Sequence, residues 1–150
     1  MKAGYKFTNA GIIPEDWELS KIGAHVLSLE AGVSVNSENR PANPNEFGVL
    51  KTSSTTQNRF NPLENKFILK TEIDRARISP LKDTIIVSRM NTPELVGAAG
   101  FVSKDYPNLF LPDRLWMAKI RNTAISKWLY FILCSDNMKE LIRNAATGTS

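Results

Sequence analysis

The side chains best suited to binding an anionic or hydrogen-bonding partner stand beside three apolar segments, residues 84–87, 97–102 and 115–120. β-branched and aromatic residues enrich these segments and turn residues bound them, so each is predicted to be a strand. Hydroxyl, amide and cationic groups stand where these strands end: Ser88, Arg89, Asn91, Thr92, Lys104 and Arg114. Such groups can bond phosphate oxygens or base edges. Polar groups at the strand ends of a rigid sheet are typical of a recognition scaffold.

A second polar run, residues 51–59, follows a predicted strand over residues 47–52. It has a cation near each end, with hydroxyl and amide side chains between them. Its candidate contacts are Lys51, Ser53, Ser54, Thr55, Asn58 and Arg59. Taken alone, this composition is more typical of a simple turn than of a binding site.

Catalytic motifs are incomplete in this sequence. Residues 64–66 have the Glu-x-Lys spacing of restriction nucleases, but the Pro-Asp pair at 112–113 follows them instead of preceding them. The Asn-Pro pairs at 43–44 and 61–62 lack the second proline and aromatic residue usual in DNA amino-methyltransferases. The glycines at 97–100 lack the GxGxxG spacing and open no helix. With a single histidine as well, we expect no catalysis, no cofactor and no metal site.

The composition is that of one globular domain. The chain has 150 residues, of which 42% are hydrophobic and 23% charged, and a net charge of +4. A mild positive charge is compatible with a polyanionic partner. One cysteine excludes an internal disulfide. No secretory signal and no apolar run long enough to cross a bilayer is visible, so a cytoplasmic protein is expected.

The hydrophobic pattern predicts an α+β domain over residues 17–150, preceded by a flexible, polar lead-in at 1–16. Its sheet is expected to be twisted and mostly antiparallel, with two C-terminal helices packed on it. Residues 31–46 have no helical or strand period and are predicted to form a long loop. Residues 22–29 fit either a helical turn or a strand.

Two helical segments are predicted near the C-terminus. The first starts at 122–125, with an apolar face made of Ile125, Trp128, Leu129, Ile132 and Leu133. Ser135 or Asp136 is predicted to cap the second segment. Further upstream, residues 65–69 are predicted to be a strand, and 70–82 to hold a short helix that ends before Pro80.

Six stretches carry a family resemblance: GIIPEDW at 11–17, VLKTSS at 49–54, FNPLENK at 60–66, SRMNTPELVG at 88–97, PNLFLPDRLW at 107–116 and ATGTS at 146–150. In this order, over nearly the whole chain, they resemble the target-recognition domain of specificity subunits in type I restriction–modification systems. Those subunits bind DNA and carry no catalytic chemistry of their own.

The resemblance implies a recognition domain related in shape to those of DNA methyltransferases. It implies sequence-specific binding of double-stranded DNA at one half of a bipartite target, with methylation and restriction subunits as partners. In that family a long spacer helix and a second recognition domain usually follow, and the chain stops at Ser150, where that helix would begin. Assembly with the partner subunits is therefore left open, whereas half-site reading is expected.

Two layers of contact follow from the resemblance. Lys51, Arg59, Lys104 and Arg114 are expected to neutralise phosphates. Base-edge contacts are expected from Ser53, Ser54, Thr55, Asn58, Arg89, Asn91 and Thr92.

Structural roles are the alternative for several of these residues. Arg114 could pair with Asp113, Asn91 could be a turn residue, and Arg89 could anchor the turn at 91–94 through backbone carbonyls. The alternative for the whole chain is a protein-interaction module that docks on a methyltransferase or another subunit without reading DNA.

Overall fold

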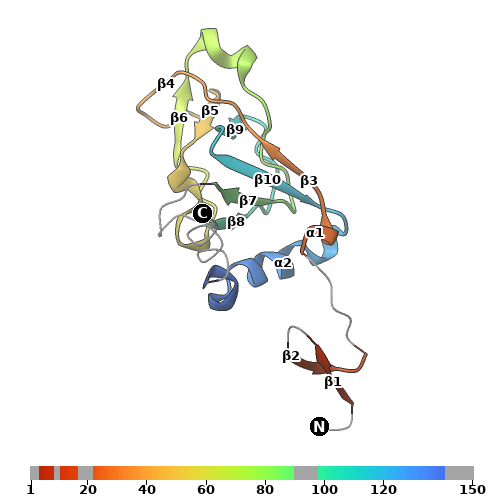
Figure 1. The fold of residues 1–150 in the computed structure, drawn as a ribbon. Coiled ribbons are helices and arrows are strands. Elements are labelled where there is room, and N and C mark those ends of the chain that lie inside the picture. The colour runs from red at the N-terminus through yellow and green to blue at the C-terminus, as the bar shows by residue number, and fades with distance from the viewer. Residues whose placement is uncertain (1–3, 9–10, 17–21, 90–97, 141–150) are drawn as a thin grey trace, which may run out of the picture.

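The chain forms an α+β fold built on two four-stranded sheets (Figure 1). This computed structural model describes residues 4–8, 11–16, 22–89 and 98–140. None of the helices within these ranges is both long and apolar enough to cross a membrane.

The first sheet has the strand order β3-β10-β7-β8 and is antiparallel throughout. Its strands are β3 (Val26–Ala31), β7 (Ile85–Ser88), β8 (Ala99–Phe101) and β10 (Leu115–Ile120). Helix α2 (Ser126–Leu133) packs on it, and Leu129 joins a buried cluster with Ile85, Ala99, Ala118 and Ile120.

The second sheet has the order β4-β6-β5-β9, and its β5–β9 pair is parallel. Its strands are β4 (Ser37–Glu38), β5 (Gly48–Leu50), β6 (Asn65–Ile68) and β9 (Leu109–Phe110). Leu50 from this sheet packs with Ile86 and Met117 from the first sheet. The two sheets therefore share one core.

Short helices connect the strands. They are α1 (Ile22–His25) and the 3₁₀ helices η1 (Thr52–Asn58), η2 (Lys70–Arg75) and η3 (Thr123–Ile125). A further helical segment over 136–140 follows α2. The Ser135 hydroxyl accepts a bond from the Met138 amide at its start, which confirms Ser135 as the predicted cap.

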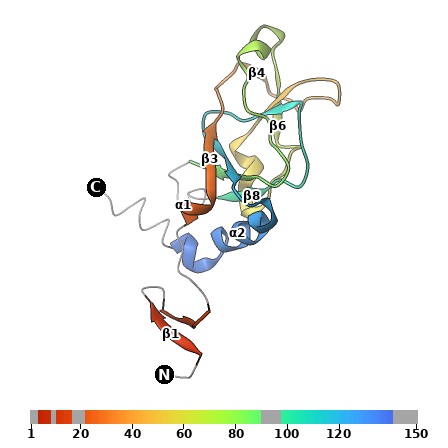
Figure 2. The same ribbon diagram turned by 90° about the vertical axis from the view of Figure 1, so that its right-hand side faces the viewer.

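The lead-in at 1–16 contains a hairpin that the sequence analysis did not predict, and its expected flexibility stays a prediction. Strands β1 (Tyr5–Thr8) and β2 (Gly11–Pro14) pair antiparallel, and in both views this hairpin stands apart from the two sheets (Figures 1 and 2). A domain boundary at residue 17 stays a prediction, because residues 17–21 lie outside the described ranges.

The strands predicted at 47–52, 65–69, 84–87, 97–102 and 115–120 are present, each within about two residues at either end. The predicted single sheet is wrong, because these strands are divided between two sheets. The loop at 31–46 contains the short strand β4, and 22–29 is a helical turn followed by a strand, so both interpretations of that segment apply.

The predicted apolar face of α2 needs one correction. Leu129 is buried, but Trp128 is 58% exposed, and the partly buried Tyr130 packs against the core instead. The sheet covers a narrower stripe of this helix than its hydrophobic residues would allow.

Candidate nucleic-acid interface

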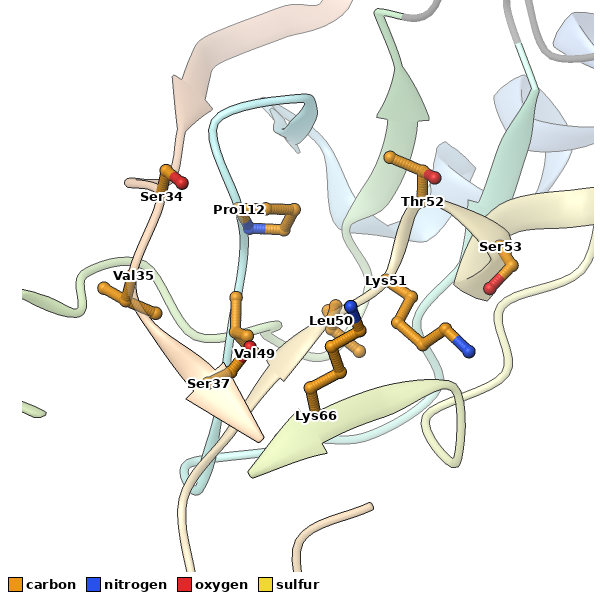
Figure 3. A pocket seen from close by; sticks show the side chains of 10 residues that line it. All are labelled: Ser34, Val35, Ser37, Val49, Leu50, Lys51, Thr52, Ser53, Lys66 and Pro112. Atoms are coloured by element: carbon orange, nitrogen blue, oxygen red, sulfur yellow. The ribbon is translucent and has the colours of Figure 1, made fainter. Parts of the chain in front are cut away.

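A pocket of about 280 Å³ opens beside strands β5 and β6 (Figure 3). Its polar lining consists of Ser34, Ser37, Lys51, Thr52, Ser53 and Lys66, and its apolar lining of Val35, Val49, Leu50 and Pro112. The lining includes two ammonium groups and four hydroxyls but no carboxylate. Such a surface favours an anionic ligand that also presents some apolar area.

Lys51 is held at the edge of this pocket by Glu64. Its Nζ lies 3.2 Å from Glu64 Oε2, and the Ser53 hydroxyl donates to the same oxygen at 2.9 Å. The hydrogen bond from Ser53, followed by the contacts with Lys51, lowers the pKa of the Glu64 carboxyl. Glu64 therefore keeps its negative charge at neutral pH and fixes both predicted contact residues in place.

Lys66 is a pocket residue that the sequence analysis missed. It lies in β6, where it is paired in register with Val49 of β5, and its side chain is half-buried. Within the described ranges, no carboxylate or other acceptor bonds its ammonium group. The sequence does hold a signal for Lys66, because it stands two residues after Glu64 and side chains two positions apart on a strand share a face. The nuclease-like spacing of 64–66 obscured this signal.

The turn at 112–114 connects the pocket to the predicted strand-end arginines. Pro112 lines the pocket, and the carbonyl of Asp113 accepts a bond from Arg89 Nη1 at 3.1 Å. The Arg89 guanidinium also lies 5.6 Å from the centre of the Trp116 ring, and Arg114 is exposed in the same turn. Arg89 thus anchors a backbone carbonyl of the 112–114 turn, whereas the turn at 91–94 named in its structural alternative lies outside the described residues.

A second feature, which we call the ring cluster, contains the predicted contacts Arg59 and Lys104 together with Phe60 and Tyr106. The Phe60 and Tyr106 rings meet edge to face with centroids 5.5 Å apart, and Lys104 Nζ lies 5.2 Å from the Tyr106 centroid. Both cations are exposed. Aromatic packing therefore holds Lys104 near Phe60, the residue that follows Arg59 in the chain.

Asn58 ties the ring cluster to α2. Its carbonyl accepts a hydrogen bond from the Tyr130 hydroxyl, and its backbone adopts a positive φ of 58°. Asparagine tolerates this left-handed conformation better than most residues. Its backbone role is therefore structural, and its half-buried side chain stays a predicted contact.

Two predicted base contacts are corrected by their burial. Ser54 and Thr55 are each 0% exposed, so neither side chain can reach a ligand on this surface. They point into the core because η1 packs against β7 and β8. Two other predicted contacts, Asn91 and Thr92, lie outside the described residues.

Comparison with known proteins gives one informative similarity. No family model matches the chain. The chain is 28% identical over 124 residues to the specificity subunit of the type I restriction enzyme EcoEI from Escherichia coli. The similar region covers 81% of this chain but 20% of that subunit, so the chain spans about a fifth of the length of the relative it matches.

Proposed function

We propose that this chain recognises a DNA target sequence. The observation that carries the proposal is the similarity to a specificity subunit over 81% of the chain. The exposed cations and hydroxyls on the pocket side and in the ring cluster support it, since phosphate contacts of this kind supply most of the affinity of DNA-binding proteins. The residues proposed for phosphate contact are Lys51, Arg59, Lys104 and Arg114.

In its finer form, the proposal is that the chain reads one half-site of a bipartite duplex target for a type I restriction–modification complex. Its fold would then correspond to the methyltransferase-type recognition domain, and its partners would be the methylation and restriction subunits. Arg89, Ser53 and Asn58 are the described candidates for base contacts, together with Asn91 and Thr92.

Selection from a random duplex library at fixed salt tests this function. We expect a short enriched motif and weak affinity. With about four phosphate contacts, the log–log dependence of affinity on salt should have a slope near −4, at about 0.9 per contact. An unenriched library combined with salt-independent binding would contradict DNA recognition.

The same proposal assigns no catalysis to the chain. Among the described residues, no group of three or more His, Cys, Asp or Glu side chains is arranged to hold a metal ion. Purified protein should neither cut nor methylate the selected DNA with magnesium or S-adenosylmethionine present. Reproducible turnover that disappears on substitution of one carboxylate would contradict this assignment.

A second function, docking on another protein, is favoured by one observation. Trp128 and Phe131 stand one turn apart on α2 and are 58% and 59% exposed. Exposed aromatic residues of this kind are enriched at protein interfaces. If docking is the function, Trp128→Ala should abolish binding to a methylation subunit, and the wild type should select no DNA motif.

A further inference from the structure

We infer that the pocket beside β5 and β6 is a binding site for a backbone phosphodiester, with Lys66 as its main cationic ligand. The inference rests on the proposed function and deepens it, because it assigns one DNA contact to a residue and a cavity that the sequence did not indicate.

The lining residues favour a phosphodiester over other ligands. Lys51 and Lys66 supply positive charge, and Ser34, Ser37 and Thr52 supply hydroxyls that can donate to phosphate oxygens. No carboxylate is among the lining residues, and Glu64, which lies beside them, is paired with Lys51 and Ser53. The apolar side chains of Val49 and Pro112 suit the deoxyribose that flanks a phosphate.

The volume of the pocket is compatible with a ligand of this size. At about 280 Å³ the pocket lies at the lower limit of ligand-binding cavities, which span roughly 300–1,000 Å³. One phosphate with part of its sugar would fit within this volume.

Lys66 and Lys51 differ in their availability to such a ligand. The Lys51 ammonium is already paired with Glu64 at 3.2 Å, so a phosphate must compete with a carboxylate for it. Lys66 has no acidic partner among the described residues. It also lies within strand β6, where its backbone is paired with Val49 of β5. Lys66 is therefore the better-placed phosphate ligand.

The 112–114 turn links the pocket to Arg89, one of the proposed base contacts. Pro112 lines the pocket, and the next residue carries the carbonyl that holds Arg89. A phosphate in the pocket would consequently fix the register of the strand whose bases lie within reach of Arg89.

The first experiment measures the salt dependence of duplex binding for Lys66→Gln and for its matched control, Lys127→Gln. Lys127 is exposed on α2, which packs on the other sheet, and loses the same charge. Lys66→Gln should flatten the slope by about 0.9, and Lys127→Gln should leave it unchanged. Equal effects of the two variants would overturn the inference and leave DNA recognition standing.

The second experiment needs no duplex binding. Amide resonances of ¹⁵N-labelled wild-type protein are followed during titration with the dinucleotide d(TpT), which has one phosphodiester, with thymidine, and with inorganic phosphate. The amide resonances of Ser34, Ser37 and Lys66 should shift with d(TpT) but not with thymidine or inorganic phosphate. Equal shifts with thymidine or inorganic phosphate, or no shift in the pocket at millimolar d(TpT), would overturn the inference. Pocket shifts without duplex binding would instead retain the site and contradict the proposed function.

Discussion

The pocket and the ring cluster present the same kinds of cation but hold them in different ways. In the pocket, Lys51 is fixed by a carboxylate and Lys66 by its position within a strand. In the ring cluster, Lys104 stands over Tyr106, whose ring packs on Phe60. Phe60 also lies against Gly100 of β8, so the ring cluster is part of the packing on that strand. We expect substitutions beneath the ring cluster to change the free energy of unfolding, and substitutions in the pocket to change the salt dependence of DNA binding.

The largest expected effect comes from breaking the packing beneath the ring cluster. A Cβ on Gly100 would lie 2.7 Å from Phe60 Cβ, 2.8 Å from Phe60 N and 2.9 Å from Phe60 Cα, and the backbone atoms cannot move independently of η1. Gly100→Ala should therefore lower the free energy of unfolding by about 1–3 kcal/mol, as overpacking commonly does. Urea denaturation followed by circular dichroism measures this loss.

Gly23→Ala is the matched control for this substitution. A Cβ at Gly23 meets no atom within 4 Å, so stability should be unchanged or slightly higher, since alanine favours the helix α1. A loss of the same size in both variants would show that the close approach of Phe60 to Gly100 does not limit packing.

Arg89 distinguishes reading from anchoring at the edge of the pocket region. If it reads a base, Arg89→Ala should relax the selected motif at particular positions, at a cost of about 1–3 kcal/mol. If it only holds the Asp113 carbonyl and covers Trp116, the same variant should lower the melting temperature and leave the motif intact. Selection and thermal melting on one protein sample decide between these outcomes.

Arg89→Lys sharpens this comparison. Lysine keeps the charge, and therefore the salt slope, but loses the two-pronged geometry that suits guanine. A motif that survives this change unaltered would argue against base reading by Arg89.

The strands were predictable because their signal is local. Apolar, β-branched segments bounded by turns identify β7 and β10 without knowledge of their neighbours. The division into two sheets was not predictable, because it depends on pairings such as β5 with β9, which join residues about sixty positions apart. The proposed function came from the family resemblance, because no residue pattern taken alone indicated DNA recognition.

The candidate site was predicted less well, because exposure is a tertiary property. Ser54 and Lys51 belong to one polar run, yet η1 turns Ser54 into the core and leaves Lys51 at the pocket. In the sequence, Lys66 is part of the nuclease-like Glu-x-Lys spacing at 64–66. Only the pairing of β6 with β5 shows that it lies beside the pocket. Local composition cannot say which side of a 3₁₀ turn faces the interior.

A substitution at Glu64 should change duplex affinity in the opposite direction from Lys66→Gln. Glu64→Gln removes the charge that competes for Lys51 and keeps an oxygen that can accept from Ser53. Lys51 then contacts phosphate without a competing carboxylate, so duplex affinity should rise several-fold and the salt slope should be at least as steep as in the wild type. Fluorescence anisotropy at several salt concentrations measures both quantities.

The control is Asp74→Asn, which changes the net charge equally. Asp74 is exposed on η2 and does not line the pocket. If Asp74→Asn raises affinity as much as Glu64→Gln does, the gain reflects net charge and Glu64 does not restrain Lys51.

The smallest expected effect is a pH dependence in the loop that borders β6. Arg40 donates to both Glu46 oxygens, at 2.8 and 3.0 Å, and its guanidinium lies 4.1 Å from the Phe67 ring centre. The bonds from Arg40, and then from the Asn43 amide, lower the pKa of Glu46 from its usual value near 4.5 to about 2. Because the folded pKa is the lower one, the stabilisation is present above about pH 4.5 and is lost as the pH falls toward 2.

Melting temperature should therefore fall between pH 4.5 and 2 more steeply in the wild type than in Glu46→Gln. Glu64 and Glu72 also have lowered pKa values, so the wild-type curve is composite, and only its difference from the variant isolates Glu46. The pair is solvent-accessible, so the difference should be small and should shrink at high salt. Parallel curves for the two proteins would mean that the Arg40–Glu46 contact does not hold this loop on β6.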